Sequence, residues 1–337
     1  MISKDVQIAP LTTFHIGGPA SFLKEVFTVK DIEDAIVCAR ENKLPLYTLG
    51  GGSNVLVPDA GVAGVVVRML VGDITFENVG DDALLVAGAG AVWEDVVDRA
   101  TTRGFFGIEN LAGIPGTIGG ASVQNIGAYG GEFKDVFAYA DVIDTATGLP
   151  RRITSTEASF AYRTSFFKQH RGYIIIRVAL RLTKRAVPNI TYPDLLRVQA
   201  TGAPLTTPKE IARTIRGIRA LKFPQDVQEG SAGSFFKNPV ISREHADELT
   251  RRFPIMPTFP QTDGSIKISL AWFLDHALLL KGFSIGRARL YERHPLVIVA
   301  QAGAHAIEVD ALASEVEKRV HAATGITIER EVEMFGT

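Results

Sequence analysis

The sequence lacks several features that would each point to a particular class of protein. Its 337 residues include one cysteine, Cys38, which can form no internal disulfide and supplies no thiolate metal site. No apolar run approaches the length needed to cross a bilayer, and the first residues lack the apolar core of a signal peptide. We therefore expect a cytoplasmic protein with no membrane partner and no metal.

An excess of charge of one sign is also missing. Lysine and arginine total 36 and aspartate and glutamate total 37, so the formal net charge is −1. This balance provides no basic surface for nucleic acid or for an anionic membrane. With 46% hydrophobic and 22% charged residues, the composition is that of an ordinary globular protein, long enough for two or three domains. We expect a monomer that binds no nucleic acid.

Lysine and arginine are absent from the stretch Gly107–Glu132, which instead holds eight glycines and one proline. This composition excludes an ordinary amphipathic helix or an alternating strand. Glycine is favoured where φ is positive, or where another backbone or a ligand comes too close for a Cβ atom. Composition alone would favour a chain of tight turns. A second glycine cluster lies upstream, at Gly50–Asn54. It favours a ligand-binding backbone over simple turns, because two such loops can hold two parts of one extended ligand.

The upstream cluster follows a predicted strand at 22–29, a helix at 31–42 and a second strand at 44–49. It lacks the G-x-G-x-x-G spacing of a Rossmann fingerprint, and no lysine follows it as in a P-loop. Its successive backbone N–H groups can still bind a phosphate, with Ser53 and Asn54 adding side-chain donors. A glycine-rich hairpin would explain this loop equally well.

Periodicity and capping signals predict the remaining elements. Three helices have clear ends: 91–103 stops at Gly104, 208–221 starts at the capping box of Thr207 and Glu210, and 307–323 stops at Gly325. The proline- and threonine-rich segment 187–207 breaks every period and is the expected domain boundary. Further strands are expected at 55–70, 84–90, 136–144, 152–155, 173–183, 296–300 and 326–335, and further helical stripes at 244–252 and 270–280.

Two strings carry a family resemblance. L-G-G-G-S-N-V-L at 49–56 and E-N-L-A-G-I-P-G-T-I-G-G-A at 109–121, followed by N-I-G-A-Y-G, closely resemble the UDP-N-acetylenolpyruvoylglucosamine reductase family. Matches at 161–168, 230–239 and 329–336 extend the resemblance over nearly the whole chain. The resemblance implies an α+β fold, with an FAD-binding body of the vanillyl-alcohol-oxidase (PCMH) type and a smaller α+β substrate-binding domain. The implied parts are a first flavin subdomain at 1–70 joined by the C-terminal strand 326–337, a second at 71–200, and a substrate domain at 207–325.

The resemblance also implies an activity. Family members reduce UDP-N-acetylglucosamine enolpyruvate to UDP-N-acetylmuramate with NADPH through noncovalent FAD, in peptidoglycan precursor synthesis. The nicotinamide and the sugar nucleotide are expected to use one pocket in turn, so no second dinucleotide motif is needed. The implied FAD contacts are Gly50, Gly51, Gly52, Ser53, Asn54, Gly113, Ile114, Pro115, Gly116, Thr117, Gly119, Gly120, Asn125 and Gly127.

Three residues match the family's catalytic positions. Arg163 would stabilise the negative charge that develops on the substrate, because its planar guanidinium is permanently charged. Ser234 would donate a proton to the substrate carbon. Glu331 is the third match, although the family usually has proline before this glutamate and a basic residue two positions after it. Since a continuous strand would place Glu329, Glu331 and Glu333 on one face, the choice among them stays open. The alternatives are a surface arginine on a loop for Arg163, a turn serine for Ser234 and, for Glu331, a match that reflects strand register only.

The substrate's UDP should meet a tyrosine on a mobile loop and donors of the smaller domain. His294 occupies a position where the family usually carries glutamine, which leaves the uridine contact undecided. Basic residues at a solvated helix end are the alternative explanation for Arg219 and Lys222. The implied substrate contacts are Tyr192, Arg219, Lys222, Asn238 and His294.

Two other functions remain open from the sequence. One is an oxidase of the same flavin superfamily, although neither glycine-rich segment contains the histidine or cysteine that a covalent flavin requires. The other is a flavin-free nucleotide-sugar-binding protein, which would leave both glycine-rich loops without a ligand.

Overall fold

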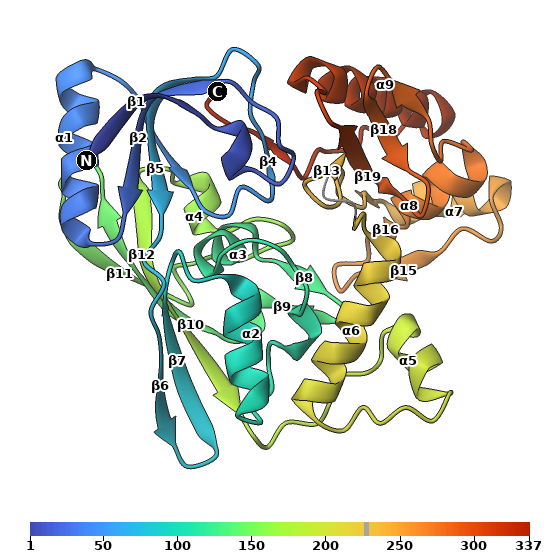
Figure 1. Cartoon of the computed structure of the whole chain (residues 1–337). Coiled ribbons are helices and arrows are strands. Elements are labelled where there is room, and N and C mark those ends of the chain that lie inside the picture. Colours follow the sequence, from blue (N-terminus) through green and yellow to red (C-terminus); the bar gives the residue numbers. More distant parts are fainter. Residues whose placement is uncertain (226–228) are drawn as a thin grey trace. The chain divides into compact units, whose positions relative to one another are not determined.

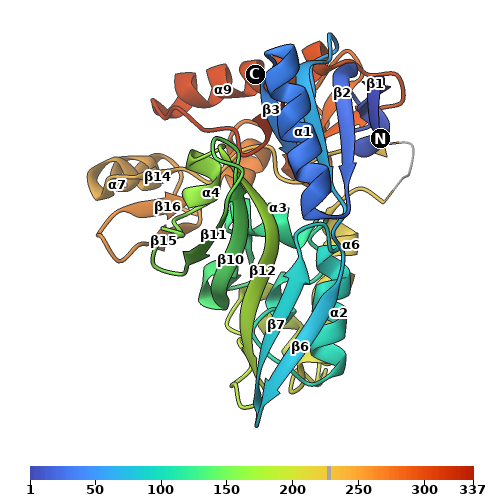
Figure 2. The ribbon, with the colours of Figure 1, turned by 90° about the vertical axis from the view of Figure 1, so that its left-hand side faces the viewer.

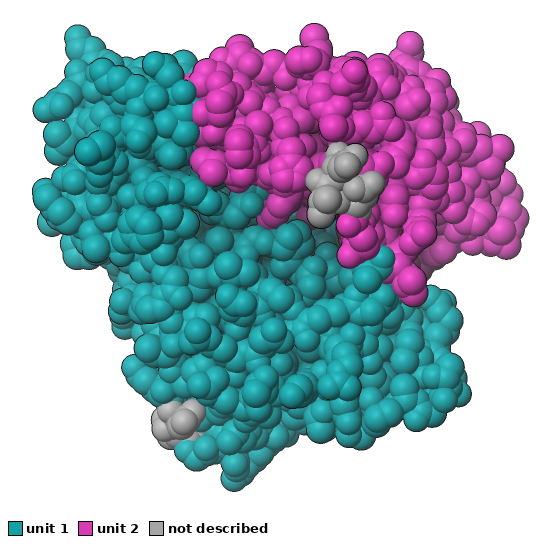
Figure 3. Space-filling model, viewed as in Figure 1, with its two compact units in different colours: residues 1–6, 20–52, 63–220 teal, residues 7–19, 53–62, 221–337 magenta. Residues whose placement is uncertain are grey.

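The computed structural model describes residues 1–225 and 229–337 and forms two compact units, coloured separately in Figure 3. The division falls in the last turn of helix α6 (Pro208–Lys222), not within 187–207 as the sequence predicts. The reason is that Leu205, Ile211 and Ile215 are buried in the core of the first unit. Unit 1 comprises residues 1–6, 20–52 and 63–220, and unit 2 comprises residues 7–19, 53–62 and 221–337.

A four-stranded sheet with one covering helix occupies the first part of unit 1 (Figure 2). Helix α1 (Val29–Asn42) buries Ile32, Ala35, Ile36 and Ala39, the stripe predicted from the sequence, among the valines of the sheet. The N-terminal strand was not predicted because it has few apolar residues in alternation. The strands, in sheet order, are β1 (Ile2–Gln7), β2 (Pro19–Val26), β5 (Val62–Met69) and β3 (Leu46–Leu49), of which β3 and β5 are parallel.

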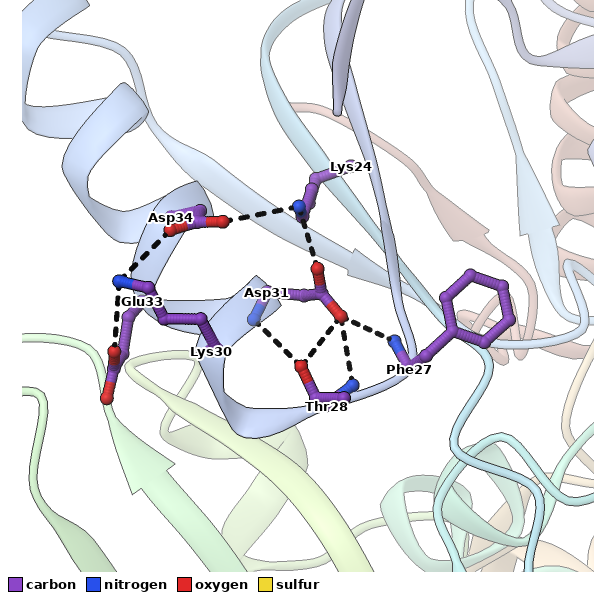
Figure 4. Close-up of polar contacts among 7 residues, drawn as sticks. All are labelled: Lys24, Phe27, Thr28, Lys30, Asp31, Glu33 and Asp34. Atoms are coloured by element: carbon purple, nitrogen blue, oxygen red, sulfur yellow. Dashed lines mark hydrogen bonds and ion pairs between the residues drawn. The ribbon is translucent and has the colours of Figure 1, made fainter.

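The start of α1 is fixed by a capping box and a buried ammonium group (Figure 4). The Asp31 carboxylate accepts hydrogen bonds from the N–H groups of Phe27 and Thr28, and Thr28 accepts from the N–H of Asp31. Lys24, whose side chain is only 4% exposed, lies 2.8 Å from Asp31 and 3.4 Å from Asp34. Because a buried ammonium needs such partners, this cluster ties β2 to the helix.

A five-stranded antiparallel sheet forms the larger part of unit 1 (Figure 1). Its central strands bury alternate apolar side chains against α2 (Trp93–Thr102) and α3 (Ile118–Gln124), and α3 contacts β12 and β7 directly. Strand β6 was not predicted because its sequence mixes polar and apolar residues. The order is β11 (Pro150–Thr154), β10 (Phe137–Asp144), β12 (Tyr173–Thr183), β7 (Asp82–Gly88) and β6 (Ile74–Val79).

The glycine-rich run folds into several short elements rather than one. Trp93, which is fully buried, anchors this run: its indole N–H donates to the carbonyl of Leu111 at 2.9 Å, and its backbone N–H donates to that of Gly116 at 3.0 Å. The run therefore lies on α2. Besides α3 it contains a 3-10 turn at Glu109–Leu111 and the two-residue strands β8 (Gly127–Ala128) and β9 (Gly131–Glu132), and a further 3-10 turn at Phe133–Asp135 follows.

Three further helices complete unit 1 as far as Ala220. The capping box predicted for α6 is confirmed, because Thr207 and Glu210 bond each other's backbone N–H groups. The preceding segment is not wholly irregular, since α5 (Pro193–Gln199) begins directly after Tyr192. The short helix α4 (Phe166–Gln169) is capped by Ser165.

Unit 2 contains a four-stranded sheet covered by helix α9 (Ala306–Thr324). The predicted end of this helix is confirmed, because Gly325 has a φ of +71° and forms the left-handed C-cap. Two N–H groups in the first turn of α9 donate to Asp59. The sheet order is β13 (Glu229–Gly230), β19 (His294–Gln301), β18 (Ala288–Tyr291) and β17 (Ser284–Ile285).

A smaller sheet and several short helices form the rest of unit 2. The helix expected at 270–280 is correct only for its first turns, because the backbone widens into a π-turn and then leaves the helix. Within the described ranges, no helix combines the length and the hydropathy of a membrane span. The elements are β14 (Val240–Ile241), β16 (Ile266–Ile268), β15 (Thr258–Pro260), α7 (Arg243–Arg252), α8 (Leu270–Trp272), the π-turn Phe273–Ala277 and a 3-10 turn at Ala9–Leu11.

The predicted C-terminal strand 326–335 is wrong in extent. Only β20 (Glu333–Met334) forms a ladder, parallel to β4 (Val55–Leu56), while Arg330 makes an isolated bridge with Phe236. The backbone bends at residues 331 and 332 because both N–H groups turn toward one carbonyl, that of Phe235. Residues 326–337 therefore belong to unit 2, together with residues 53–62.

Candidate active site

The two glycine-rich segments meet in unit 1. A Cβ atom added to Gly51 would lie 2.7 Å from the Cα of Gly116, and one added to Gly50 would lie 2.7 Å from the hydroxyl of Thr117. Gly51 is therefore required by the close approach of another backbone, and Gly50 by the side chain of Thr117. Thr117 also caps α3 through the N–H of Gly120. The result is a surface of bare peptide groups, on which Gly51 itself is exposed.

The loop at Gly113 is held on both sides by charged side chains. Its N–H donates to Glu94 at 2.6 Å, and its carbonyl accepts from the Nε of Arg219 at 2.9 Å. Arg216, one turn earlier on α6, pairs with both Glu94 and Asp98 of α2. Sequence analysis missed Glu94 and Arg216, whose role depends on the packing of two helices far apart in the sequence. Arg219 thus already contacts the glycine-rich loop.

Arg163 lies in a two-residue turn closed by reciprocal backbone bonds between Ala161 and Thr164. Its φ is +55°, a conformation that costs a non-glycine residue of order 1–3 kcal/mol and recurs at functional sites. The guanidinium donates to the carbonyl of Gly127 at 2.9 Å, and a Cβ on Gly127 would lie 3.1 Å from it. Glycine at 127 therefore leaves room for the Arg163 side chain.

Two neighbouring side chains support the Arg163 turn. Asn125, buried and left-handed at the end of α3, donates to the carbonyl of Ala161 at 3.0 Å. Lys168 donates to Gln124 at 3.0 Å and lies 3.4 Å from the carbonyl of Arg163. In this structure the Asn125 amide positions the turn, and its expected FAD contact stays a prediction. Lys168 was missed, although it ends the same string that contains Arg163.

Tyr192 packs edge-on against Tyr129, with ring centroids 5.1 Å apart. Burial raises the pKa of Tyr129 to about 12 and also raises the pKa of Tyr192, so both phenols stay protonated. Burial lowers the pKa of Arg219, which interacts electrostatically with Tyr129. Asn110 links this pair to its surroundings by donating to the carbonyls of Tyr129 and Asn189. Unit 1 thus brings Tyr192 and Arg219 to one aromatic cluster.

In unit 2 the structure brings Ser234 and Glu331 together. Ser234 forms a backbone bridge with Val297 of β19. The next carbonyl, that of Phe235, accepts the N–H of Glu331 at 2.8 Å and that of Val332 at 3.4 Å. Two of the three expected catalytic residues are therefore joined through one main-chain bond at one sheet edge.

The geometry of the C-terminal segment distinguishes the three glutamates. The bend at 331–332 ends the alternation, so Glu329, Glu331 and Glu333 do not share one strand face. The Glu329 side chain is 72% exposed and pairs with Lys237 at 2.7 Å. Glu331 is half-buried, and its carbonyl accepts the side-chain amide of Asn54 at 3.0 Å. Of the three, Glu331 is the one bonded next to Ser234.

Comparison with known proteins identifies the family. A model described as the FAD binding domain matches residues 21–154, and the C-terminal domain model of UDP-N-acetylenolpyruvoylglucosamine reductase matches residues 225–335. The Pseudomonas aeruginosa protein named UDP-N-acetylenolpyruvoylglucosamine reductase is 36% identical over 99% of both chains. The chain belongs to the UDP-N-acetylenolpyruvoylglucosamine reductase family. The resemblance stated from the sequence is thereby confirmed.

Other members of the family agree with this assignment. The Escherichia coli K12 protein of the same name is 37% identical, over 98% of this chain and 95% of its own. The crystal structure of the reductase from Thermus caldophilus covers 99% of this chain and 100% of its own, with 26% identity and a TM-score of 0.69. The α+β fold with an FAD-binding domain, expected from the sequence, is confirmed.

The remaining expected substrate residues lie in unit 2. His294 stacks on Phe223 with ring centroids 5.6 Å apart. Lys222 directly precedes that phenylalanine, at the end of α6. The Asn238 side-chain oxygen accepts the N–H of Leu270 at 3.0 Å. Over residues 1–225 and 229–337, no three histidine, cysteine or acidic side chains gather as a metal site requires.

Proposed function

We propose that this protein reduces UDP-N-acetylglucosamine enolpyruvate to UDP-N-acetylmuramate, with NADPH as the reductant and FAD as a noncovalent cofactor. The observation that carries the proposal is the similarity over 99% of the chain to a protein named UDP-N-acetylenolpyruvoylglucosamine reductase. The reaction is a step of peptidoglycan precursor synthesis. We place it in the cytoplasm and expect a monomer, and both remain predictions.

The residues of the two glycine-rich loops fit FAD. Gly50–Asn54 and Gly113–Gly120 contain no carboxylate, so nothing in them repels a diphosphate. The close approach of Gly51 to Gly116 leaves no room for a Cβ on Gly51, so that a phosphate can reach the main chain there. The N–H groups of Gly113, Gly119 and Gly120 already donate to Glu94, Ala89 and Thr117. Thr117, Gly119 and the other expected contacts would extend this surface. The chemistry that FAD would supply when bound is hydride transfer from NADPH to the enolpyruvyl methylene carbon.

Arg163 stabilises the negative charge that develops on the substrate's α-carbon and carboxylate. Its guanidinium is suited to this role because it stays charged and presents several donors in a fixed plane. The bonds from Arg163 to Gly127 and from Asn125 to Ala161 hold the turn before substrate binds, so little reorganisation is needed.

Ser234 donates the proton that the substrate's α-carbon requires. A serine hydroxyl is a weak acid, so it must act in a site that stabilises its alkoxide. Glu331 supports the same step from the adjacent main-chain segment. The bond from Glu331 to the carbonyl of Phe235 holds its main chain one residue from Ser234.

The UDP group binds through donors from several elements. We assign Tyr192, Arg219, Lys222, Asn238 and His294 to these contacts. Lys222 is the point charge for the diphosphate, and the aromatic faces of His294 and Phe223 are suited to the uracil ring. Arg219 has a second role, since it also holds Gly113 in the proposed flavin loop.

The absorption spectrum of the purified protein tests this function first. We expect a flavin band that bleaches when NADPH is added under anaerobic conditions and returns when UDP-N-acetylglucosamine enolpyruvate is added. A flavin that NADPH does not bleach but an alcohol or sugar does would indicate an oxidase instead. A protein that takes up no flavin, yet binds the nucleotide sugar, would overturn the proposal in favour of a binding protein.

A further inference from the structure

Arg330 directly precedes Glu331 and is anchored to helix α9 by its whole guanidinium group. Its Nε and Nη2 atoms lie 2.6 and 3.3 Å from the two carboxylate oxygens of Glu317. Its Nη1 lies 2.5 Å from Asp310, and its Nη2 donates to Ser314 at 2.9 Å. The three partners are spaced three and four residues apart, so they form one face of the helix. The side chain is 27% exposed, which limits screening by solvent.

The segment around Glu331 is also held by contacts with Phe235 and Asn54. The guanidinium lies 6.0 Å from the centre of the buried Phe235 ring, and the Phe235 carbonyl accepts the N–H of Glu331. Beyond the bend, the Glu331 carbonyl accepts the amide of Asn54, whose own carbonyl accepts the N–H of Glu333 at 3.1 Å. Glu331 is thus held from α9, from the Ser234 segment and from the end of the first glycine-rich loop.

We propose that Arg330 and Asn54 are positioning residues that fix Glu331 beside Ser234 for the proton-transfer step. The inference rests on the proposed function for what Glu331 does and adds which residues orient it. Neither residue needs to touch the reacting atoms. The two residues restrict the conformation of the bent, half-buried segment around Glu331. Strand β20 alone would not do so, because its ladder with β4 includes only Glu333 and Met334.

The identity of residue 330 supports this account. The bridge between Phe236 and Arg330 is made by the Glu329 carbonyl and the Glu331 N–H, so the N–H of residue 330 takes no part in it. A proline at this position would therefore cost neither of these bonds, and its ring would restrict φ. In this chain, the ion pairs of Arg330 to α9 supply the restraint that a proline ring would otherwise give.

The test compares Arg330→Met with Arg319→Met as a matched control. Arg319 also lies on α9, pairs with Glu315 at 2.7 Å and covers the ring of Phe283, but contacts no part of the Glu331 segment. Hydrogen exchange by mass spectrometry reports on the peptide around residues 328–335. We expect Arg330→Met to raise exchange there and Arg319→Met to leave it unchanged.

Anaerobic stopped-flow measurements on the flavin-loaded protein supply the second readout. Arg330→Met should slow reoxidation by the enolpyruvyl nucleotide roughly 10- to 100-fold, as misplaced groups commonly do, with flavin reduction by NADPH nearly unchanged. Arg330→Pro should recover most of the rate and of the exchange protection. Asn54→Ala should raise exchange of the same peptide.

Specific outcomes would overturn the inference. If Arg330→Met and Arg319→Met gave the same exchange and the same reoxidation rate, Arg330 would be a stabilising surface residue only. If Arg330→Met did not fold, Arg330→Lys and Arg330→Pro would decide instead, and equal loss in both would exclude a positioning role. A wild-type protein that does not react with the nucleotide would refute the proposed function, whereas the exchange comparison would still stand.

Discussion

Two proposed catalytic residues are held in opposite ways. Arg163 in unit 1 sits on strained backbone with a φ of +55°, and the bonds from Asn125 and Lys168 that support its turn span 36 and 5 residues along the chain. Glu331 in unit 2 belongs to a bend fixed by main-chain bonds to Phe235 and to the amide of Asn54, 277 residues away. A charge-stabilising group is thus built locally, whereas the proton-transfer pair is assembled from distant segments.

The difference shows how each site should respond to change. At the Arg163 turn, one side-chain amide can be removed while the backbone path is kept. At the Glu331 bend, the restraint is spread over several bonds, so that each contributes part of the positioning. The predictions below test this contrast, beginning with the largest effect.

Ser234→Ala should have the largest effect, because it removes the proton donor itself. Loss of a positioned general acid costs roughly 10²–10⁴-fold, and we expect this fall in flavin reoxidation by the nucleotide but not in reduction by NADPH. Stopped-flow absorbance follows both steps in one sample. Ser231→Ala is the matched control and should leave both rates near wild type. Equal slowing of both steps by Ser234→Ala would show that the serine supports the flavin or the fold.

Gly51→Ala tests whether the contact between the two glycine-rich loops of unit 1 tolerates an added Cβ atom. The new Cβ would lie 2.7 Å from the Cα of Gly116, so the loops must separate, at a cost of roughly 1–3 kcal/mol in unfolding free energy and with loss of flavin. Gly217→Ala in α6 is the control, since no atom lies within 4 Å of its Cβ position. It should stabilise the protein by about 0.5–1 kcal/mol. Full flavin content in Gly51→Ala would contradict the assignment of these loops.

Asn125→Gly isolates the amide that supports Arg163. Glycine keeps the left-handed backbone, with a φ of +43° at this position, but loses the bonds to Ala161 and Lys134. We expect a loss of about 1–2 kcal/mol by denaturant titration and slower reoxidation by the nucleotide. Lys43→Gly, at a left-handed helix end with an exposed side chain, should be neutral or slightly stabilising. If both variants behaved alike, the amide would not position the turn.

The smallest effect should come from the capping cluster of α1, which contributes none of the proposed site residues. The hydrogen bond from Lys24 holds the pKa of Asp31 below its ordinary value, so its stabilisation is present above the unfolded pKa of about 3.9 and is lost as the pH falls through and below that value. Asp31→Asn should cost about 1 kcal/mol at pH 7 and progressively less below pH 4. Thermal unfolding at several pH values measures this. Glu33→Gln, an exposed partner of Lys30, should show a smaller change, and a pH-independent difference for Asp31→Asn would refute the mechanism.

Sequence patterns correctly predicted the helix ends that neighbouring residues determine. The capping box of Thr207 and Glu210 and the glycine stop at Gly325 depend only on neighbouring residues, and both are correct. The wrong extent of the last strand has a long-range cause, since the bend at 331–332 is imposed by the carbonyl of Phe235. The two compact units divide in α6 rather than at 187–207 for a similar reason, because Leu205 is buried in a core that the local pattern does not show.

The candidate site was predictable to a similar degree. Resemblance singled out Ser234 and Glu331, and the structure joins their segments by a main-chain bond that no side-chain pattern encodes. Asn54 shows the limit, because its side chain donates to the Glu331 carbonyl, a contact that the sequence did not suggest. Such a contact can be inferred only once β4 and β20 are known to be paired. The expected phosphate contact of Asn54 stays a prediction.

The pairing of β4 with β20 also has a consequence for how the chain matures. Val55 and Glu333 are partners, so during synthesis from the N-terminus unit 2 cannot close until the segment around Glu333 has left the ribosome. Unit 1, by contrast, has all its strands once Thr183 has emerged. Contacts of long sequence separation form slowly, because the loop between them must be ordered first. Residues 7–19 and 53–62 are therefore synthesised long before the rest of unit 2. A chaperone that acts on the nascent protein would find exposed apolar surface in these two segments.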